Sequence, residues 1–251
     1  MLIKEKITIF GGYNMRLLII LSALILCFSV SSISNAKGKK KRMSRLIRNL
    51  EAKKKQVVIT YGTSLTSHGG WVKELEGILN KRYPKLVTSI NSGGSGKWSQ
   101  WGLVNLKSRV IMKKPDTVFI EFSMNDSVER FDCSVKKSKK NLETMIDMIL
   151  KSNSKCEIIL MTMTPGNGQA DKRVNIKKYY EVYRQVAKQR RLLLIDHHPN
   201  WLKLQSKNKK LFDKYVPDSI HPTPEGCSEI ITPVIVKALG MKTKKRKVKR
   251  K

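Results

Sequence analysis

Cysteine is scarce in this chain, and the spacing of its cysteines excludes the sites that they most often build. The 251 residues include four cysteines, with no Cys-x-x-Cys pair and no cysteine–histidine spacing typical of a zinc site. Cys133, Cys156 and Cys227 lie in the central part of the chain, and their odd number argues against a disulfide framework. We therefore expect a domain held together by its hydrophobic core, with no metal and no organic cofactor.

Long hydrophobic runs are also missing. The longest, from Leu17 to Val30, is shorter than the roughly 20 residues that a membrane-spanning helix needs. It follows Arg16 and precedes the small residues Ser34-Asn35-Ala36, which is the pattern of a secretory signal peptide. We expect residues 1–36 to be such a signal peptide and the protein to be exported to the periplasm or the extracellular space. An N-terminal membrane anchor that is not cleaved is the alternative.

Acidic residues are few, since 19 Asp and Glu stand against 51 Lys and Arg and the formal net charge is +32. Residues 37–55 contain ten basic residues and one acidic residue, and residues 241–251 contain eight basic residues and no acidic one. Runs of like charge repel and have little to bury, so we expect a basic disordered linker over 37–55 and a basic disordered tail over 241–251. Such segments attract anionic glycans or a membrane surface without specificity, and we expect no specific nucleic acid partner. A tail that is merely solvated is the alternative.

The stretch between these segments, residues 56–240, is long enough for one domain with a sizeable core. Runs rich in β-branched and aromatic residues predict strands over 57–61, 86–90, 116–122, 158–163 and 192–196. Apolar residues at helical spacing predict helices over 70–82, about 100–112, 142–149, 176–187 and 223–238, with Pro233 kinking or splitting the last one. This alternation predicts an α/β fold, a three-layer sandwich with a five-stranded parallel sheet that helices cover on both faces.

Polar groups follow successive strands of this sheet. Ser64 comes after the first strand, Gly96 after the second and Asn125 after the third, while Asp218 and His221 precede the last helix. Because the carboxyl ends of parallel strands share one edge of the sheet, we expect these residues to gather there.

Four short blocks contain these residues: Gly62-Thr63-Ser64-Leu65, Asn91-Ser92-Gly93-Gly94-Ser95-Gly96, Ser123-Met124-Asn125-Asp126 and Asp218-Ser219-Ile220-His221-Pro222. With these blocks in this order, the chain resembles the SGNH (GDSL-type) hydrolase family over the whole of 56–240. The tract Ser99-Gln100-Trp101-Gly102 is similar to the secreted bacterial esterase, thioesterase and lysophospholipase branch of that family. The resemblance implies a flavodoxin-like SGNH hydrolase fold.

The resemblance also implies a role for each residue of the blocks. Ser64 would be the nucleophile, His221 the general base and Asp218 the residue that orients the imidazole. The backbone N–H groups of Ser64 and Gly96 and the side-chain amide of Asn125 would form the oxyanion hole. The chemistry requires such groups, because a serine hydroxyl is a poor nucleophile until a base takes its proton, and the tetrahedral oxyanion that follows needs hydrogen-bond donors.

Two residues depart from the family pattern. Thr63 stands where the family usually has an aspartate, which removes a carboxylate that helps to organise the neighbouring loops. Ser123 stands where the family usually has a glycine, and this matters only if that position needs a positive φ, where serine is strained. Neither departure removes a group that the bond-making steps require.

Other polar and aromatic residues near these blocks leave alternatives open. His68 either lines the substrate cleft or lies on the loop surface. Trp98 and Trp101 either form a wall for a sugar or an acyl group, or pack in the core. His197 and His198, at the end of the fifth predicted strand, are expected to be structural or rim residues.

Together these features predict an exported serine ester hydrolase that works through an acyl-enzyme on Ser64. Its substrate is either a lysophospholipid or thioester, or an O-acetylated carbohydrate, for which the basic surface is well suited. Two other functions remain open: a catalytically impaired module of the same fold that binds polyanions, for which Thr63 is the indication, and an O-acyltransferase.

Overall fold

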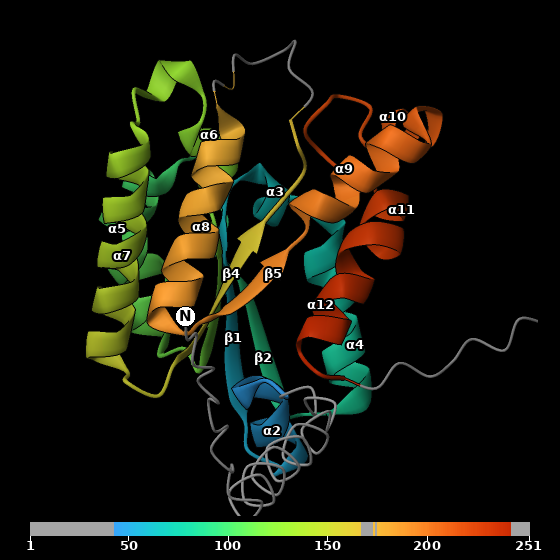
Figure 1. The fold of residues 1–251 in the computed structure, drawn as a ribbon. Coiled ribbons are helices and arrows are strands. Elements are labelled where there is room, and N and C mark those ends of the chain that lie inside the picture. Colours follow the sequence, from blue (N-terminus) through green and yellow to red (C-terminus); the bar gives the residue numbers. More distant parts are fainter. Residues whose placement is uncertain (1–42, 167–172, 174, 242–251) are drawn as a thin grey trace, which may run out of the picture. The chain divides into compact units, whose positions relative to one another are not determined.

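The computed structural model describes residues 43–166, 173 and 175–241 (Figure 1). The predicted signal peptide and residues 242–251 of the predicted tail lie outside them. Within the described ranges, no helix combines the length and the apolar character needed to cross a membrane.

Five parallel strands form the central sheet, in the order β2-β1-β3-β4-β5. This order is that of the flavodoxin-like doubly wound fold. The central strands are buried on both faces, as their continuous apolar runs require. The strands are β1 (Gln56–Gly62), β2 (Val87–Asn91), β3 (Thr117–Glu121), β4 (Glu157–Thr162) and β5 (Leu193–Asp196). The predicted five-stranded parallel sheet is confirmed.

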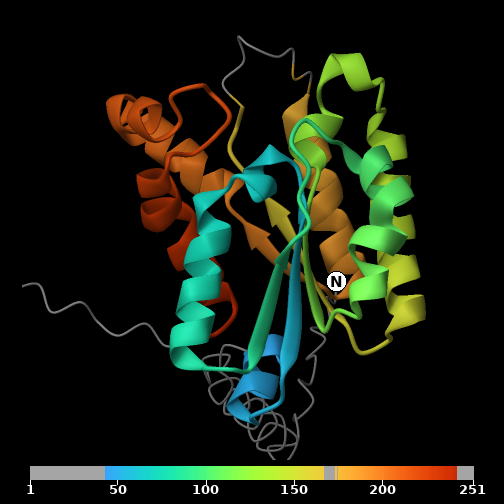
Figure 2. The same cartoon turned by 180° about the vertical axis from the view of Figure 1, so that it is seen from behind.

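Helices cover both faces of this sheet, and side chains that alternate along β1 divide between two cores. Ile59 packs in the core beneath α5 (Ser99–Arg109), α7 (Val135–Ser152) and α8 (Ile176–Arg190). Val58 packs in the opposite core, beneath α4 (Gly70–Arg82) and α12 (Thr232–Ala238). Figure 2 shows β2 at the edge of the sheet, with α4 on one side and α5 on the other. The predicted three-layer arrangement is therefore present.

Several shorter helices complete the fold. Two of them, α3 (Ser64–Ser67) and α6 (Ser123–Asp126), begin directly after β1 and β3 at the carboxyl edge of the sheet. Neither α9 (His198–Lys207) nor α10 (Lys209–Tyr215) was predicted from the sequence.

The last predicted helix is divided, as Pro233 suggested. Thr223 caps α11 (Pro224–Gly226), since its hydroxyl accepts a hydrogen bond from the Gly226 N–H at 3.1 Å. A π-helical segment, η3 (Cys227–Ile231), then joins α11 to α12, which carries Pro233 in its first turn. Proline lacks the N–H that a continuous α-helix would need at this point.

The prediction of a disordered linker over 37–55 is wrong for its second half. Residues 45–51 form α2 (Arg45–Glu51), and Leu46, Ile47 and Leu50 are fully buried in the core. The carboxylate of Glu157 accepts the N–H groups of Arg45 and Leu46, both at 2.7 Å, at the amino end of this helix. The apolar face of α2 consists of only three residues, and exposed basic residues surround it in the sequence. The composition of the segment therefore does not indicate a buried helix.

The domain is also longer at its other end than predicted. Met241, assigned to the basic tail, is 7% exposed and packs in the same core as α2. The backbone N–H of Ser44 bonds to the Leu239 carbonyl oxygen, which ties the two ends of the domain together. The described domain thus includes residues on both sides of 56–240.

Candidate active site

The chain turns sharply where β1 ends, and this turn presents the Ser64 hydroxyl. Thr63 is extended (φ −84°, ψ −160°) and caps α3, since its hydroxyl accepts the Leu65 N–H at 3.1 Å. Ser64 is the first residue of α3 and lies at the carboxyl edge of the sheet, where α/β folds bind their ligands. The predicted strand-to-serine transition is therefore present.

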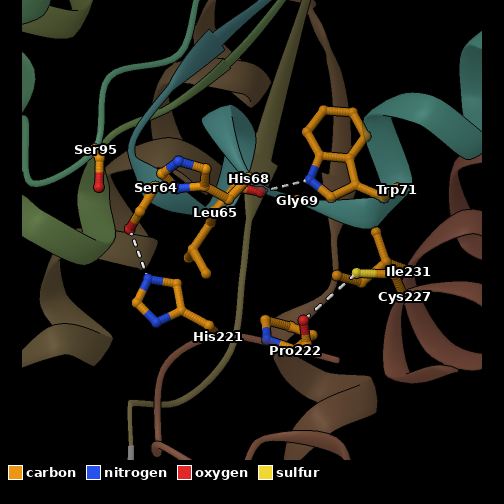
Figure 3. A pocket seen from close by; sticks show the side chains of 10 residues that line it. All are labelled: Ser64, Leu65, His68, Gly69, Trp71, Ser95, His221, Pro222, Cys227 and Ile231. Atoms are coloured by element: carbon orange, nitrogen blue, oxygen red, sulfur yellow. Dashed lines mark hydrogen bonds between the residues drawn. The ribbon is translucent and has the colours of Figure 1, made fainter. Parts of the chain in front are cut away.

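His221 and Asp218 meet Ser64 in a hydrogen-bonded chain. Ser64 Oγ lies 2.7 Å from His221 Nε2 (Figure 3), and His221 Nδ1 lies 2.5 Å from Asp218 Oδ2. The other carboxylate oxygen, Asp218 Oδ1, accepts the backbone N–H groups of Ile220 at 3.0 Å and His221 at 2.7 Å. A residue 157 positions away in the sequence thus reaches Ser64 through a loop that its own aspartate organises.

The state of the Asp218 carboxyl selects the tautomer of the imidazole. Partial burial works against ionisation, but the hydrogen bonds from His221 and the Ile220 N–H outweigh it and lower the pKa of Asp218. An ionised Asp218 can only accept, so Nδ1 of His221 carries the proton. The lone pair of Nε2 then faces the Ser64 hydroxyl, which is the arrangement of a general base.

Gly96 and Asn125 lie on neighbouring loops at the same edge of the sheet. Gly96 has a φ of +65°, a conformation that glycine adopts without strain. The Asn125 side-chain amide donates to the Lys97 carbonyl oxygen at 2.8 Å, which joins α6 to the Gly96 loop. An asparagine amide has two N–H groups, so one remains to act as a donor toward a ligand. A further bond, from the Gly94 N–H to the Gly62 carbonyl oxygen, ties this loop to the end of β1.

A pocket of about 230 Å³ opens beside Ser64 and His221 (Figure 3). Its polar side includes His68, which is exposed and lines this pocket. Its other wall is apolar, and the indole N–H of Trp71 holds the Leu65 carbonyl oxygen at 2.7 Å. The remaining lining residues are Gly69, Ser95, Pro222, Cys227 and Ile231.

A second feature adjoins the Gly96 loop, and we call it the basic–aromatic stack. The rings of Trp98 and Phe131 stack with centroids 5.4 Å apart. The Lys137 ammonium lies 5.0 Å from the Trp98 ring, and the Arg130 guanidinium lies 5.0 Å from the Phe131 ring. Lys137 and Arg130 are exposed, so this stack presents two cations to solvent beside the loop. Trp101, by contrast, packs against the core beneath α5.

The two departures from the family pattern have clear structural outcomes. Ser123 begins α6 and has no positive φ, so the condition under which serine would be strained there is not met. Thr63 lies against the buried carboxylate of Glu121, which accepts its backbone N–H at 2.7 Å and its hydroxyl at 3.0 Å. Glu121 was not predicted as a functional residue; its signal in the sequence is a charged residue within a largely apolar strand.

His197 and His198 are buried, so of the two predicted roles, structural or rim residues, they have the structural one. His198 Nδ1 lies 3.4 Å from the Arg184 guanidinium, and its ring packs 4.8 Å from the Tyr180 ring. Burial lowers the pKa of His197 to about 3 and that of His198 to about 4, so both are neutral. Across residues 43–166, 173 and 175–241, no group of three His, Cys, Asp or Glu side chains has the arrangement of a metal site, and Cys133, Cys156 and Cys227 are free.

Comparison with known proteins gives concordant matches. The family model for the GDSL-like lipase/acylhydrolase family matches residues 32–228. An acetylxylan esterase from Geobacillus stearothermophilus is 28% identical over 137 residues, and the match spans 51% of this chain and 62% of that protein.

Solved structures show the same fold. A catalytic mutant of an acetylxylan esterase from Geobacillus stearothermophilus superposes with a TM-score of 0.66 at 22% identity, over 77% of this chain and 98% of that one. A lipase/acylhydrolase from Enterococcus faecalis superposes with a TM-score of 0.63 at 24% identity, over 76% of this chain and all of that one (100%).

Proposed function

Since the chain belongs to the GDSL-like lipase/acylhydrolase family, we propose that it hydrolyses carboxylic esters through an acyl-enzyme on Ser64. The hydrogen-bonded chain from Ser64 Oγ through His221 to Asp218 is the observation that carries this proposal. It supplies a nucleophile, a general base whose Nε2 atom faces that nucleophile, and a carboxylate that stabilises the imidazolium when it forms.

The reaction proceeds in two balanced halves. Ser64 Oγ attacks the acyl carbon while its proton passes to His221 Nε2, and the carbonyl oxygen becomes an oxyanion. The N–H groups of Ser64 and Gly96 and the Asn125 amide stabilise that oxyanion, each donor contributing on the order of 10²–10³ in turnover. His221 then protonates the departing alcohol as the carbon–oxygen bond breaks. A water molecule then attacks the acyl carbon of the acyl-enzyme and gives its proton to His221. Breakage of the bond to Ser64 Oγ releases the acid, and the proton from His221 restores the Ser64 hydroxyl.

The direct test is Ser64→Ala on the full chain, assayed with p-nitrophenyl acetate. We expect hydrolysis to fall at least about 10³-fold, with an unchanged circular dichroism spectrum, because alanine removes only the nucleophilic oxygen. Ser67→Ala, a serine on the same short helix, is the matched control and should retain activity. Hydrolysis that survives Ser64→Ala would remove Ser64 from the mechanism.

We further propose an O-acetylated carbohydrate as the substrate. The relatives named as acetylxylan esterases support this class, although the chain spans only 62% of the length of the curated one. The basic–aromatic stack beside the Gly96 loop supports a glycan that carries acidic groups, since its two exposed cations attract anions. The pocket beside Ser64 then has to hold only the acetyl group and the adjoining ring.

A lysophospholipid or thioester is the second candidate, and the apolar wall of the pocket favours it. Leu65, Trp71 and Ile231 offer a surface on which an acyl chain can pack. The two classes separate in a series of p-nitrophenyl esters from acetyl to decanoyl, followed by acetylated glucuronoxylan against lysophosphatidylcholine. A preference for acetyl esters supports the carbohydrate, and a rate that rises with chain length supports the lipid.

Two further hypotheses are decided by chemistry at Ser64. Covalent labelling by a fluorophosphonate distinguishes an active hydrolase from an impaired binding module. Adding a sugar acceptor distinguishes an O-acyltransferase, because acetylated sugar would then form in place of acetate.

Export remains a proposal, supported by the apolar run from Leu17 to Val30. Its test is N-terminal sequencing of the protein recovered from the periplasm or the medium of an expressing bacterium. A mature chain that begins at Lys37 supports a cleaved signal peptide, and an intact N-terminus in the membrane fraction supports an anchor.

A further inference from the structure

Glu121 lies directly beneath the turn that carries Ser64. It is the last residue of β3, it pairs in register with Gly62 at the end of β1, and it is 1% exposed. Its Oε1 atom accepts the Thr63 N–H at 2.7 Å and the Thr66 hydroxyl at 2.7 Å, while the Thr63 hydroxyl lies 3.0 Å from Oε1 and 3.1 Å from Oε2. One carboxylate thus holds the residues on both sides of Ser64.

Gly62 makes room for this carboxylate. A Cβ atom at position 62 would lie 2.2 Å from Glu121 Oε1 and 2.4 Å from the Glu121 carbonyl oxygen, which no side chain can accommodate. Gly62, two residues before Ser64, is therefore required for space. Its φ is not in the left-handed region, so its backbone conformation does not require a glycine. The close approach brings the charge of Glu121 against the backbone of the turn.

In the part of the chain that the structure describes, the surroundings of Glu121 contain donors for a carboxylate and no cation paired with it. The Thr63 N–H can only donate, and among the described residues no Lys, Arg or His forms an ion pair with Glu121. The titratable groups that face it are Asp126 on α6 and the hydroxyls of Tyr180 and Tyr183 on α8. Burial raises the pKa of Glu121 to about 7, against the opposing effect of the bonds from Thr66 and Thr63. The ionised form accepts from all of these groups, whereas a proton on Oε2 would require the Thr63 hydroxyl, 3.1 Å away, to accept a hydrogen bond in place of donating one.

We propose that Glu121 is a positioning residue for acyl transfer, whose ionised carboxylate holds the turn from Thr63 to Thr66 in the geometry that aims Ser64. This inference rests on the proposed role of Ser64 as nucleophile. The turn determines the direction of both the Ser64 Oγ atom and the Ser64 N–H, one of the donors to the oxyanion. Protonation of Glu121 changes its contact with the Thr63 hydroxyl and weakens the hydrogen bonds from the Thr63 N–H and the Thr66 hydroxyl, because their acceptor loses its charge. We expect this change to lower turnover although Glu121 does not contact the substrate.

The test is Glu121→Gln, which keeps the size of the side chain and removes its charge. With p-nitrophenyl acetate at pH 8, we expect kcat to fall about tenfold and KM to change less than twofold, because the turn does not bind the ester in its ground state. In the wild type, Glu121 must lose a proton for full turnover, and glutamine has no such proton to lose. On the acid side of the pH–kcat profile, the slope of log kcat against pH should therefore decrease by one unit in Glu121→Gln.

Glu157→Gln is the matched control. The Glu157 carboxylate likewise accepts hydrogen bonds at the start of a short helix, in its case from two N–H groups of α2, but it lies at the opposite edge of the sheet. We expect this variant to change stability and to leave kcat and the pH profile unaltered. An equal loss of kcat in both variants would show a general structural effect and overturn the inference.

A second variant, Thr66→Val, tests the same contact without altering the carboxylate. Loss of the Thr66 hydroxyl removes a bond that lowers the pKa of Glu121, so the acid limb should move to higher pH. An unmoved acid limb in Thr66→Val, or wild-type kcat in Glu121→Gln, overturns the role of Glu121 alone. Activity that survives Ser64→Ala overturns the proposed function instead, so the two failures are distinguishable.

Discussion

The buried carboxylate of Glu121 makes the stability of the fold depend on pH, and the magnitude follows from its environment. Burial raises its pKa from 4.5 to about 7 in the folded chain. Between these values the folded state keeps a proton that the unfolded state has lost, so the free energy of unfolding falls as the pH rises. The full pKa difference corresponds to a loss of about 3 kcal/mol in the free energy of unfolding. About 2.5 kcal/mol of this is lost between pH 5 and pH 8.

Other buried groups titrate in the same range, so the wild-type curve alone does not isolate Glu121. Asp126 acts with the same sign, since burial raises its pKa from 3.8 to about 6. His197 and His198 act with the opposite sign, because their pKa values are lowered from 6.5 to about 3 and about 4, and acid then favours the unfolded state. The useful quantity is therefore the difference between Glu121→Gln and the wild type at each pH.

Urea unfolding of both proteins, followed by circular dichroism at pH 5, 6, 7 and 8, measures that difference. We expect the variant to gain about 2.5 kcal/mol relative to the wild type from pH 5 to pH 8, because glutamine cannot ionise. The stability of the variant relative to the wild type should thus rise with pH while its kcat is lowered, a combination that simple damage to the fold would not produce. A difference between the two proteins that stays constant with pH would refute a buried, uncompensated charge at position 121.

Two further predictions concern the site and the core. Asp218→Asn should lower kcat for p-nitrophenyl acetate by roughly 10² or more, because asparagine does not stabilise the imidazolium; its melting temperature should stay close to the wild-type value, since the Asp218 side chain is 53% exposed. Unchanged kcat would mean that His221 needs no carboxylate partner. Leu50→Ala should lower the free energy of unfolding by about 3 kcal/mol, because Leu50 on α2 is fully buried; a loss within about 0.5 kcal/mol in a urea titration would contradict the packing of this helix.

Local patterns predicted the sheet, and they indicated Ser64 and His221, which the structure brings together at its carboxyl edge. The apolar runs that form β1 and β3 are buried on both faces, so almost every residue in them carries the signal of a buried strand. Ser64, Asn125 and His221 lie within recognisable blocks, and the shared edge of a parallel sheet then requires those blocks to meet. The order of the blocks along the chain was sufficient to name the residues.

The predictions were wrong for residues whose burial depends on partners that are distant in the sequence. The segment around α2 was assigned to a disordered linker because its basic residues outnumber Leu46, Ile47 and Leu50, and only the core that they enter makes them a buried face. Met241 was assigned to a basic tail for the same reason. A count of charges along the chain does not show which side chains point inward.

By itself, the sequence determined the parallel α/β sheet, the residues proposed for catalysis and the edge at which they gather, because periodicity and short motifs are properties of the local chain. Only the tertiary structure decided that Ser64 Oγ lies 2.7 Å from His221 Nε2, that α2 belongs to the domain, and that Glu121 lies beneath the Ser64 turn. The energy of a carboxylate depends on the water excluded around it and on the donors that face it, and segments far apart in the chain supply both.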